Sequence, residues 1–450
     1  MIDFEKLAKF SKNAPRYTSY PTAVEFKDLS EKDILPFLKS KKPLSLYFHL
    51  PFCKSACYFC GCNVIYTSKS SKKSRYIEYL KKELDILSKY LDTNRVVRQL
   101  HFGGGTPTFF DEKELEDIYS LIYSYFKNFE EDAEISVEID PRYFTKEQMD
   151  VLKKNGVNRL SFGVQDFNEK TQRAVNRVQS FELTKRVVDI AREAGIESIN
   201  IDLIYGLPYQ TLDTFKNTLN LVKELDPDRL AVFNYAHVPW LKKTMRKIDE
   251  TTLPSPDEKL KIFKYTIDFF ENNGYKMIGM DHFAKENDEL FKAIKKGELH
   301  RNFQGYTTKG GADLIGVGIT SISETEDAYF QNYKDLKKYE ESIDNGKIPV
   351  FRGVILNEDD KIRKYVIMEM MANFSFDIKR FEEKFNVSFF EYFKEEISEL
   401  KEFVDEGLVS ITPNKIEVSK TGTLLIRNIV LPFDTYYKKM VNKKVFSKSI

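Results

Sequence analysis

Residues 47–63 read YFHLPFCKSACYFCGCN and hold all four cysteines of a 450-residue chain. Cys53, Cys57, Cys60 and Cys62 fall within ten residues, which is too dense for four separate core positions. Disulfides are not favoured, because a chain of this length builds its own core and nothing in it indicates an oxidising compartment. The four thiols therefore indicate shared metal chemistry.

The spacing of the cysteines separates two kinds of metal site. A four-cysteine zinc site usually divides its ligands into two short pairs separated by a longer loop, whereas spacers of three, two and one residues run here without a break. Cys53, Cys57 and Cys60 can each hold one corner of a cubane, and Cys62 is expected to point elsewhere in an extended loop. The spacing favours a [4Fe–4S] cluster with three protein ligands and one open iron, with zinc as the alternative.

Phe59, directly before the third cysteine, completes a pattern that resembles the radical S-adenosylmethionine (SAM) superfamily, in which SAM chelates the open iron. Other segments extend the resemblance to the family of oxygen-independent coproporphyrinogen III oxidases. They are PRYTSYPT (15–22), GGGTPT (103–108), VEIDPR (137–142), FGVQDFN (162–168), NIDLIYGLP (200–208), FNYAH (233–237), GMDHFA (279–284), HRNFQGYTT (300–308) and IRNI with FDTYY (426–437). The resemblance covers essentially the whole chain.

Composition excludes several other classes. The net charge is +1 with 31% charged residues, so no global field attracts nucleic acid or a membrane surface, and we expect neither as a partner. The N-terminus has acids among its bases and no apolar core segment, so it does not resemble a signal peptide. No apolar run approaches the length of a membrane span. With unpaired cysteines, these features predict a soluble cytoplasmic protein.

From residue 44 short apolar strands alternate with helical patterns, which predicts βαβ units and a parallel sheet. The expected strands are 44–49, 98–102, 134–139, 158–162, 199–204 and 229–233, and they indicate a (β/α)6 partial barrel, which is also the radical SAM fold. Polar motifs follow the carboxyl ends of these strands, where β/α barrels gather their catalytic loops. These are the cysteine loop, GGGTP, Glu138, Gln165, Asp202 and residues 234–237.

The predicted fold class is α/β in three segments. Residues 1–40 form an N-terminal arm, 41–345 the barrel with substrate-site loops, and 346–450 a mostly helical, winged-helix-like lid domain with a hairpin about Pro413 and Asn414. The arm is either a clamp across the barrel or a wall of the substrate site. A helix is expected after residue 253, capped by Ser255 and ended by Gly274. The basic loop 69–75 is expected to be solvated, with docking of an acidic electron donor as the alternative.

The resemblance also implies roles for individual residues. Cys53, Cys57 and Cys60 would ligate the cluster, and Cys62 would be catalytic without ligating iron. Contacts to SAM would fall on Tyr47, which would also be catalytic, and on Phe59, Gly104, Gly105, Thr106, Glu138 and Ile322. The family holds a second SAM molecule, whose matching positions are Gln165, Arg177, Asp202 and Ala236. Taken alone, Arg177 would be interpreted as a surface salt bridge and Asp202 as a helix cap, but together on one barrel rim they favour the functional interpretation.

The implied reaction is the conversion of coproporphyrinogen III into protoporphyrinogen IX in haem biosynthesis. A 5′-deoxyadenosyl radical from SAM would take a hydrogen atom from the ring A and ring B propionates, which then lose CO2 and become vinyl groups. Four propionates need cationic or amide donors, for which Arg16, Arg301 and Gln304 are our hypotheses. A monomer served by a small reductant such as flavodoxin or ferredoxin is expected.

Three alternatives to this function stay open on the sequence. They are a haem-binding chaperone, a zinc-stabilised binding protein and a radical SAM enzyme acting on another tetrapyrrole, such as a haem-degrading methyltransferase. Cys62, PRYTSYPT and HRNFQGYTT argue against the chaperone, because we associate these features with the oxidases.

Overall fold

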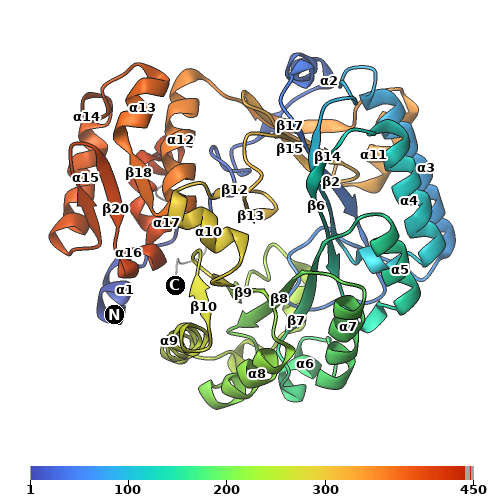
Figure 1. The fold of residues 1–450 in the computed structure, drawn as a ribbon, viewed down its shortest axis with the longest axis horizontal. Helices are drawn as coiled ribbons and strands as arrows, with labels where there is room; N and C mark the ends of the chain where they lie inside the picture. Colours follow the sequence, from blue (N-terminus) through green and yellow to red (C-terminus); the bar gives the residue numbers. More distant parts are fainter. Residues whose placement is uncertain (1, 441–445, 447–450) are drawn as a thin grey trace. The chain divides into compact units, whose positions relative to one another are not determined.

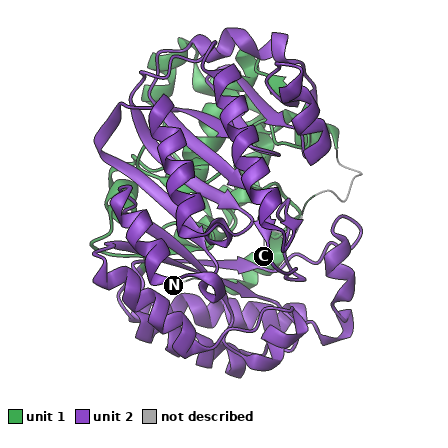
Figure 2. Ribbon diagram, turned by 90° about the vertical axis from the view of Figure 1, so that its right-hand side faces the viewer, with its two compact units in different colours: residues 1–26, 276–310, 354–450 green, residues 27–275, 311–353 purple. Residues whose placement is uncertain are grey.

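The computed structural model describes residues 2–440 and residue 446 of the chain (Figure 1). It contains two compact units, each discontinuous in sequence (Figure 2). Unit 1 comprises Met1–Phe26, Lys276–Gly310 and Val354–Ile450, and unit 2 comprises Lys27–Tyr275 and Gly311–Gly353. The three segments expected from composition stay a prediction. Within the described residues, no helix is both long and apolar enough to cross a membrane.

Unit 2 is built on six parallel strands, which confirms the predicted partial barrel. In spatial order they are β2 (Leu44–Leu50), β5 (Val97–Gly104), β6 (Phe129–Ile139), β7 (Arg159–Gln165), β8 (Ser198–Tyr205) and β9 (Arg229–Asn234). β2 is buried along almost its whole length, whereas β7 and β8 alternate between buried and half-buried positions. Continuous burial is typical of parallel strands that are covered on both faces.

Helices connect these strands and lie side by side along the sheet (Figure 1). They are α3 (Ser70–Leu87), α4 (Glu112–Tyr125), α5 (Lys146–Lys154), α6 (Glu169–Ala174), α7 (Phe181–Glu193), α8 (Leu212–Leu225) and α9 (Pro256–Asn272). α9 begins as predicted, because the Ser255 side chain accepts a hydrogen bond from the Glu258 amide and Pro256 occupies the first turn. Gly274 follows its end with φ +88°.

The stretch 69–75 is solvated as expected, except at Lys73, but it forms the start of a helix and not a loop. Lys69 is the N-cap of α3, and the residues after it are helical. Lys73 is buried and pairs with Glu114, and Arg75 Nη2 lies 2.9 Å from Glu340 Oε2. Two of the basic side chains in this stretch therefore already have acidic partners within unit 2.

The sheet extends beyond the six predicted strands. β14 (Asp313–Val317) lies parallel to β2, and the antiparallel strands β15 (Ile322–Glu324), β16 (Ala328–Asn332), β17 (Val350–Ile355) and β1 (Lys27–Asp28) follow it. A buried ion pair between Arg95 and Asp313 joins the start of β14 to the turn before β5. These strands have two to six residues each, which is too short for a reliable period-two pattern.

A buried carboxyl fixes the loop after β14. Glu83 of α3 is 2% exposed and accepts hydrogen bonds from the Gly318 amide (2.8 Å), Asn332 Nδ2 (2.7 Å) and the Tyr339 hydroxyl. Burial raises the pKa of Glu83 to about 7, although its three donors act in the opposite direction. The protonated carboxyl is therefore favoured more strongly in the folded protein than in the unfolded chain.

This carboxyl predicts a pH-dependent stability. A group with a raised pKa in the folded state stabilises the protein below its unfolded pKa, and this contribution is lost as the pH rises through the folded value. Between about pH 5 and pH 8, the free energy of unfolding should fall by up to a few kcal/mol more in the wild type than in Glu83→Gln. Urea unfolding at both pH values measures the difference. The exposed Glu78→Gln variant on the same helix should follow the wild type, and parallel pH profiles for wild type and Glu83→Gln would contradict the prediction.

Unit 1 combines the two ends of the chain with a middle segment. Its helices are α1 (Phe4–Phe10), α10 (Glu289–Lys296), α12 (Glu358–Asn373), α13 (Ile378–Phe385), α14 (Phe389–Tyr392), α15 (Lys394–Asp405), α16 (Lys420–Leu424), α17 (Ile426–Ile429) and α18 (Thr435–Lys439). β12 (His300–Asn302) and β13 (Gly305–Thr307) form a hairpin. The predicted hairpin about Pro413 and Asn414 is confirmed as β19 (Val409–Ile411) and β20 (Lys415–Val418), and β18 (Ser375–Asp377) adds a third strand.

Candidate active site

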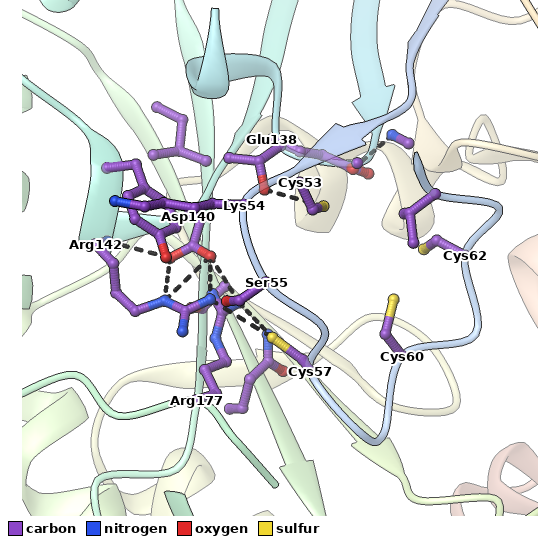
Figure 3. A pocket seen from close by; sticks show the side chains of 18 of the residues that line it. Cys53, Lys54, Ser55, Cys57, Cys60, Cys62, Glu138, Asp140, Arg142 and Arg177 are labelled. Carbon is purple, nitrogen blue, oxygen red and sulfur yellow. Dashed lines mark hydrogen bonds and ion pairs between the residues drawn. The ribbon is translucent and has the colours of Figure 1, made fainter. Parts of the chain in front are cut away.

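The four cysteines line one pocket of unit 2, together with side chains from the carboxyl ends of β5 to β8 (Figure 3). The sequence-predicted residues on this pocket are Cys53, Cys57, Phe59, Cys60, Cys62, Gly104, Gly105, Thr106, Glu138, Gln165, Arg177 and Asp202. The expectation that polar motifs at successive strand ends would meet is therefore confirmed. Parallel strands bring their carboxyl ends to the same edge of a sheet, which explains the convergence.

The cysteine loop leaves β3 (Phe52–Cys53) and returns as β4 (Ile65–Tyr66). Asn176 Nδ2 donates to the Ala56 carbonyl (2.7 Å), and the Tyr58 amide donates to the Val175 carbonyl (2.9 Å). Lys242 Nζ donates to the carbonyl of Cys62 (3.2 Å). Neighbouring segments thus hold the loop in place through hydrogen bonds to its backbone.

The prediction that Cys62 points away from the other cysteines is wrong. Its side chain lines the same pocket as those of Cys53, Cys57 and Cys60, and Figure 3 shows the sulfur atoms of Cys60 and Cys62 on the same side of the loop. The spacer of one residue places both thiols on one side because the loop turns at Tyr58 and Phe59 and bends at Cys62 instead of continuing in an extended conformation. Cys62 therefore belongs to the same pocket as the three predicted ligands.

At residues 103–105, three glycines without side chains, the backbone itself packs against the cysteine loop. Gly104 has φ +110°, and a Cβ there would lie 2.5 Å from the His49 ring. A Cβ on Gly105 would lie 2.6 Å from the carbonyl oxygen of Phe52. Thr106 Oγ1 lies 3.4 Å from Cys53 Sγ. Only glycine fits the first two positions, so this edge of the pocket is bare backbone that a ligand can approach closely.

Glu138 supplies a carboxylate beside the glycines. The Gly104 amide donates to Glu138 Oε2 (3.3 Å), and His101 Nε2 lies 3.6 Å from Oε1. Burial alone would raise the pKa of Glu138, but the hydrogen bond and charge of His101, together with the Gly104 amide, hold it below the usual range. The carboxylate therefore remains ionised at neutral pH and can accept hydrogen bonds from a cationic group.

Two guanidinium groups surround Cys57 (Figure 3). Arg142 Nη2 lies 3.5 Å and Arg177 Nη1 3.6 Å from Cys57 Sγ, and both arginines also bind Asp140, at 2.7 Å and 3.0 Å. Although burial opposes ionisation of Asp140, the two arginines hold its pKa below the usual range. Arg177 is 8% exposed, so the alternative of a surface salt bridge is wrong.

The far side of the pocket carries Gln165 and Asp202. Gln165 ends β7 with φ +71°, a conformation that non-glycine residues adopt rarely. Asp202 lies within β8, where it accepts hydrogen bonds from Asn200 Nδ2 (2.8 Å) and Ser161 Oγ (3.2 Å). The alternative of Asp202 as a helix cap is therefore wrong.

Six predicted site residues are not on this pocket. The Tyr47 hydroxyl lies 3.0 Å from His49 Nδ1, and its ring stacks on His101. Ala236 is exposed in the loop after β9, and Ile322 begins β15. The three predicted substrate residues, Arg16, Arg301 and Gln304, lie in unit 1.

The comparisons with known proteins cover the whole chain. Residues 47–222 match the model of the Radical SAM superfamily, and residues 356–425 match the HemN C-terminal domain. The chain is 55% identical over 456 residues to the oxygen-independent coproporphyrinogen III oxidase of Helicobacter pylori strain J99, covering 100% of this chain and 99% of that protein. The chain belongs to the family of oxygen-independent coproporphyrinogen III oxidases.

Comparisons with other members of the family lead to the same assignment. The Escherichia coli K12 oxidase is 46% identical over 451 residues, covering 100% of this chain and 98% of that protein. A solved structure described as coproporphyrinogen III oxidase (HemN) from Escherichia coli, a radical SAM enzyme, superposes with a TM-score of 0.92 at 45% identity, covering 97% of this chain and 99% of that one. The fold and the resemblance stated from the sequence are both confirmed.

The family implies a [4Fe–4S] cluster and SAM, and the residues of the pocket fit both groups. Cys53, Cys57 and Cys60 offer three thiol ligands on one loop, and N–H groups point at the sulfur of Cys57 as they do around cluster ligands. Among the residues that the structure describes, no three His, Cys, Asp or Glu side chains could hold one metal ion. A cluster differs from a single ion in that its ligands bind separate irons.

Sequence reasoning missed several residues of the pocket. Asp140 and Arg142 belong to the quoted segment VEIDPR, but they received no role. Ser161, on β7, was also not singled out. For Asp140 and Arg142 the available signal was their position just beyond the end of β6, on the same rim as Glu138, whereas Ser161 lies within β7.

The two arginines predict a redox effect. Hydrogen bonds and positive charge at a ligand sulfur favour the reduced cluster. Arg142→Gln removes one of the two guanidinium charges at Cys57 and leaves that of Arg177, so we expect a more negative midpoint potential by on the order of 60 mV, a tenfold change in the one-electron equilibrium. A redox titration followed by electron paramagnetic resonance measures it. Arg173→Gln, whose side chain is 68% exposed, should leave the potential unchanged, and an unchanged potential in Arg142→Gln would refute this prediction.

Proposed function

We propose that this protein catalyses the oxygen-independent oxidative decarboxylation of coproporphyrinogen III in haem biosynthesis, converting the ring A and ring B propionates into the vinyl groups of protoporphyrinogen IX. The observation that carries this proposal is the pocket in which a loop of clustered thiols, a bare glycine edge and the Glu138 carboxylate meet. Identity of 55% over the whole chain to an oxidase of this name supports it.

When bound, the cluster and SAM would supply the radical chemistry that removes a hydrogen atom from the substrate. The residues of the chain would bind and orient these groups. Cys53, Cys57 and Cys60 would hold the cluster through three thiolates. The ionised Glu138 would accept hydrogen bonds from the amino group of SAM. Gly104 and Gly105 have no side chains, so their backbone would let that end of SAM approach closely.

The remaining contacts to SAM are proposed from the family resemblance. Tyr47, Phe59, Thr106 and Ile322 complete the first site. Gln165, Arg177, Asp202 and Ala236 form a second SAM site. The buried ion pair of Arg177 and the hydrogen-bonded Asp202 carboxylate support this, because both side chains are held in place on the pocket wall. We propose Tyr47 and Cys62 as catalytic, with Cys62 binding no iron.

The partners and the location are also proposals. The reaction needs an external electron, which a small cytoplasmic reductant such as flavodoxin or ferredoxin can supply. We propose a monomer in the cytoplasm, where thiols stay reduced and available to iron.

Product analysis tests the function. The protein is reconstituted anaerobically with iron and sulfide, then given SAM, a reductant and coproporphyrinogen III, and the products are identified by mass spectrometry. A divinyl product, with a transient monovinyl species and stoichiometric 5′-deoxyadenosine, is expected. Deoxyadenosine without decarboxylation would point to a different tetrapyrrole substrate. Neither product, from protein with an intact cluster, would point to a haem chaperone.

A further inference from the structure

Unit 1 contains a buried guanidinium with unused donors. Arg301, on β12, is 8% exposed, and its Nε and Nη1 groups have no hydrogen-bond acceptor among the described residues. Within the part of the chain that the structure describes, its Nη2 reaches only the Arg16 carbonyl, at 3.5 Å, and its guanidinium carbon lies 4.7 Å from the centre of the Tyr306 ring. A buried charged donor without an acceptor is costly, so such a group usually serves a ligand or a partner.

A second unused donor lies in the same hairpin. The side-chain nitrogen of Gln304, in the turn between β12 and β13 (Figure 1), is buried and has no acceptor among the described residues. A guanidinium and a primary amide in one short hairpin offer three or more N–H groups. That donor set suits a carboxylate, which accepts through two oxygens.

A carboxylate and two further guanidinium groups lie near Arg301. Asp281 is the carboxylate that acts on the guanidiniums of Arg16, Arg301 and Arg427, and it pairs directly with Arg16. Arg427 is 3% exposed and donates to the carbonyls of Pro15 and Ala14. Burial, followed by the positive charge of Arg16, lowers the pKa of Arg427 to about 9, and the negative charge of Asp281 acts in the opposite direction.

We propose that Arg301 and Gln304 bind a propionate carboxylate of the tetrapyrrole substrate, and that Asp281 competes with that carboxylate for the guanidinium cluster. This assignment rests on the proposed function, because a substrate with four propionates supplies the anion. It extends that function by naming the internal carboxylate that the substrate must outcompete. Asp281 also binds His282 Nδ1 (2.7 Å), which holds its carboxylate in place beside Arg16.

The competition predicts effects of opposite sign for two neighbouring substitutions. Arg301→Ala removes the donors and should weaken binding of the carboxylate at least tenfold. Arg301→Lys should also weaken it, because an ammonium keeps the charge but lacks the planar fork. Asp281→Asn removes the competing charge and should tighten binding. General damage to the fold weakens binding in every variant, so a tighter complex in Asp281→Asn distinguishes competition from misfolding.

The probe is coproporphyrin III, the stable oxidised form of the proposed substrate, titrated into the full-length protein and followed by its fluorescence. The tetramethyl ester of the same porphyrin should bind more weakly to the wild type and show no further loss in Arg301→Ala. Arg186→Ala, an exposed arginine on α7, is the matched control and should bind as the wild type does. Gln304→Ala should weaken binding of the free acid a few-fold.

Three results would overturn the proposal. Equal porphyrin affinity in the wild type and Arg301→Ala would place the carboxylate elsewhere, and weaker binding in Asp281→Asn would exclude the competition. A loss of SAM binding in Arg301→Ala, with porphyrin binding intact, would assign the guanidinium to the SAM carboxylate. These titrations need no turnover, so they stand apart from the product analysis. Porphyrin binding that depends on Arg301 without decarboxylation would keep this site and reject only the proposed reaction.

Discussion

Replacing Cys57 with serine is expected to abolish the iron–sulfur cluster and all product formation. Cys57 is 8% exposed and is the thiol on which the N–H groups of Arg142 and Arg177 converge. Serine keeps the size of the side chain but offers a hydroxyl that is not deprotonated at neutral pH, so one corner of the cluster loses its thiolate ligand. Activity should fall by more than the roughly 10–100-fold typical of losing a partner behind a metal ligand.

Iron and sulfide analysis and the visible absorbance of the reconstituted variant measure this effect. Cys53→Ser and Cys60→Ser should behave in the same way. Cys62→Ser is the matched control on the same loop, and it should keep about four irons per chain and the same absorbance while losing turnover. A Cys57→Ser protein with a full complement of iron, or a Cys62→Ser protein without it, would show that the ligand set has been assigned wrongly. Stoichiometric zinc in the wild type would favour the zinc alternative.

The barrel could be predicted because its signals are local. Each of the six strands is a short apolar run that ends in a polar or glycine motif, and the convergence of those motifs follows from parallel pairing alone. The extension through β14 to β17 and β1 could not be found in this way. Its strands are short, and β14 pairs with β2 across more than two hundred residues of sequence. A long-range pairing of this kind leaves no local periodicity.

The site residues also divide into those that local sequence signals predict and those whose position depends on long-range contacts. Glu138, Gln165 and Asp202 could be placed on the rim from the strand pattern, whereas the contact of Arg142 with Cys57 depends on how a turn after β6 folds against the cysteine loop. The direction of Cys62 depends on a bend of the chain at Cys62 itself, whereas the sequence analysis assumed an extended loop. Sequence spacing gave the set of thiols, but their orientation is set by contacts such as Lys242 with the Cys62 carbonyl.

Alanine at Gly105 is expected to disturb the cysteine loop and the approach of SAM at once. Its new Cβ would lie 2.6 Å from both the Phe52 carbonyl oxygen and the Pro51 carbonyl carbon, and these are backbone atoms that cannot move aside as a flexible side chain can. The Gly105 amide also donates to the Leu50 carbonyl (2.8 Å), so the clash is fixed in place by the parallel pairing of β2 and β5. Relief requires the chain just before Cys53 to shift, at a cost of about 1–3 kcal/mol of stability.

The shift predicts a loss of SAM affinity of at least about tenfold, since misplacing a binding edge by a fraction of an ångström removes close backbone contacts. Equilibrium dialysis of SAM with the reconstituted protein, alongside urea unfolding, measures both effects. Gly61→Ala is the matched control, because it lies in the cysteine loop but its Cβ would meet no heavy atom within 4 Å. It should bind SAM and unfold as the wild type does. Equal SAM affinity in the two glycine variants would mean that the bare backbone at Gly105 serves the packing of the loop and not the ligand.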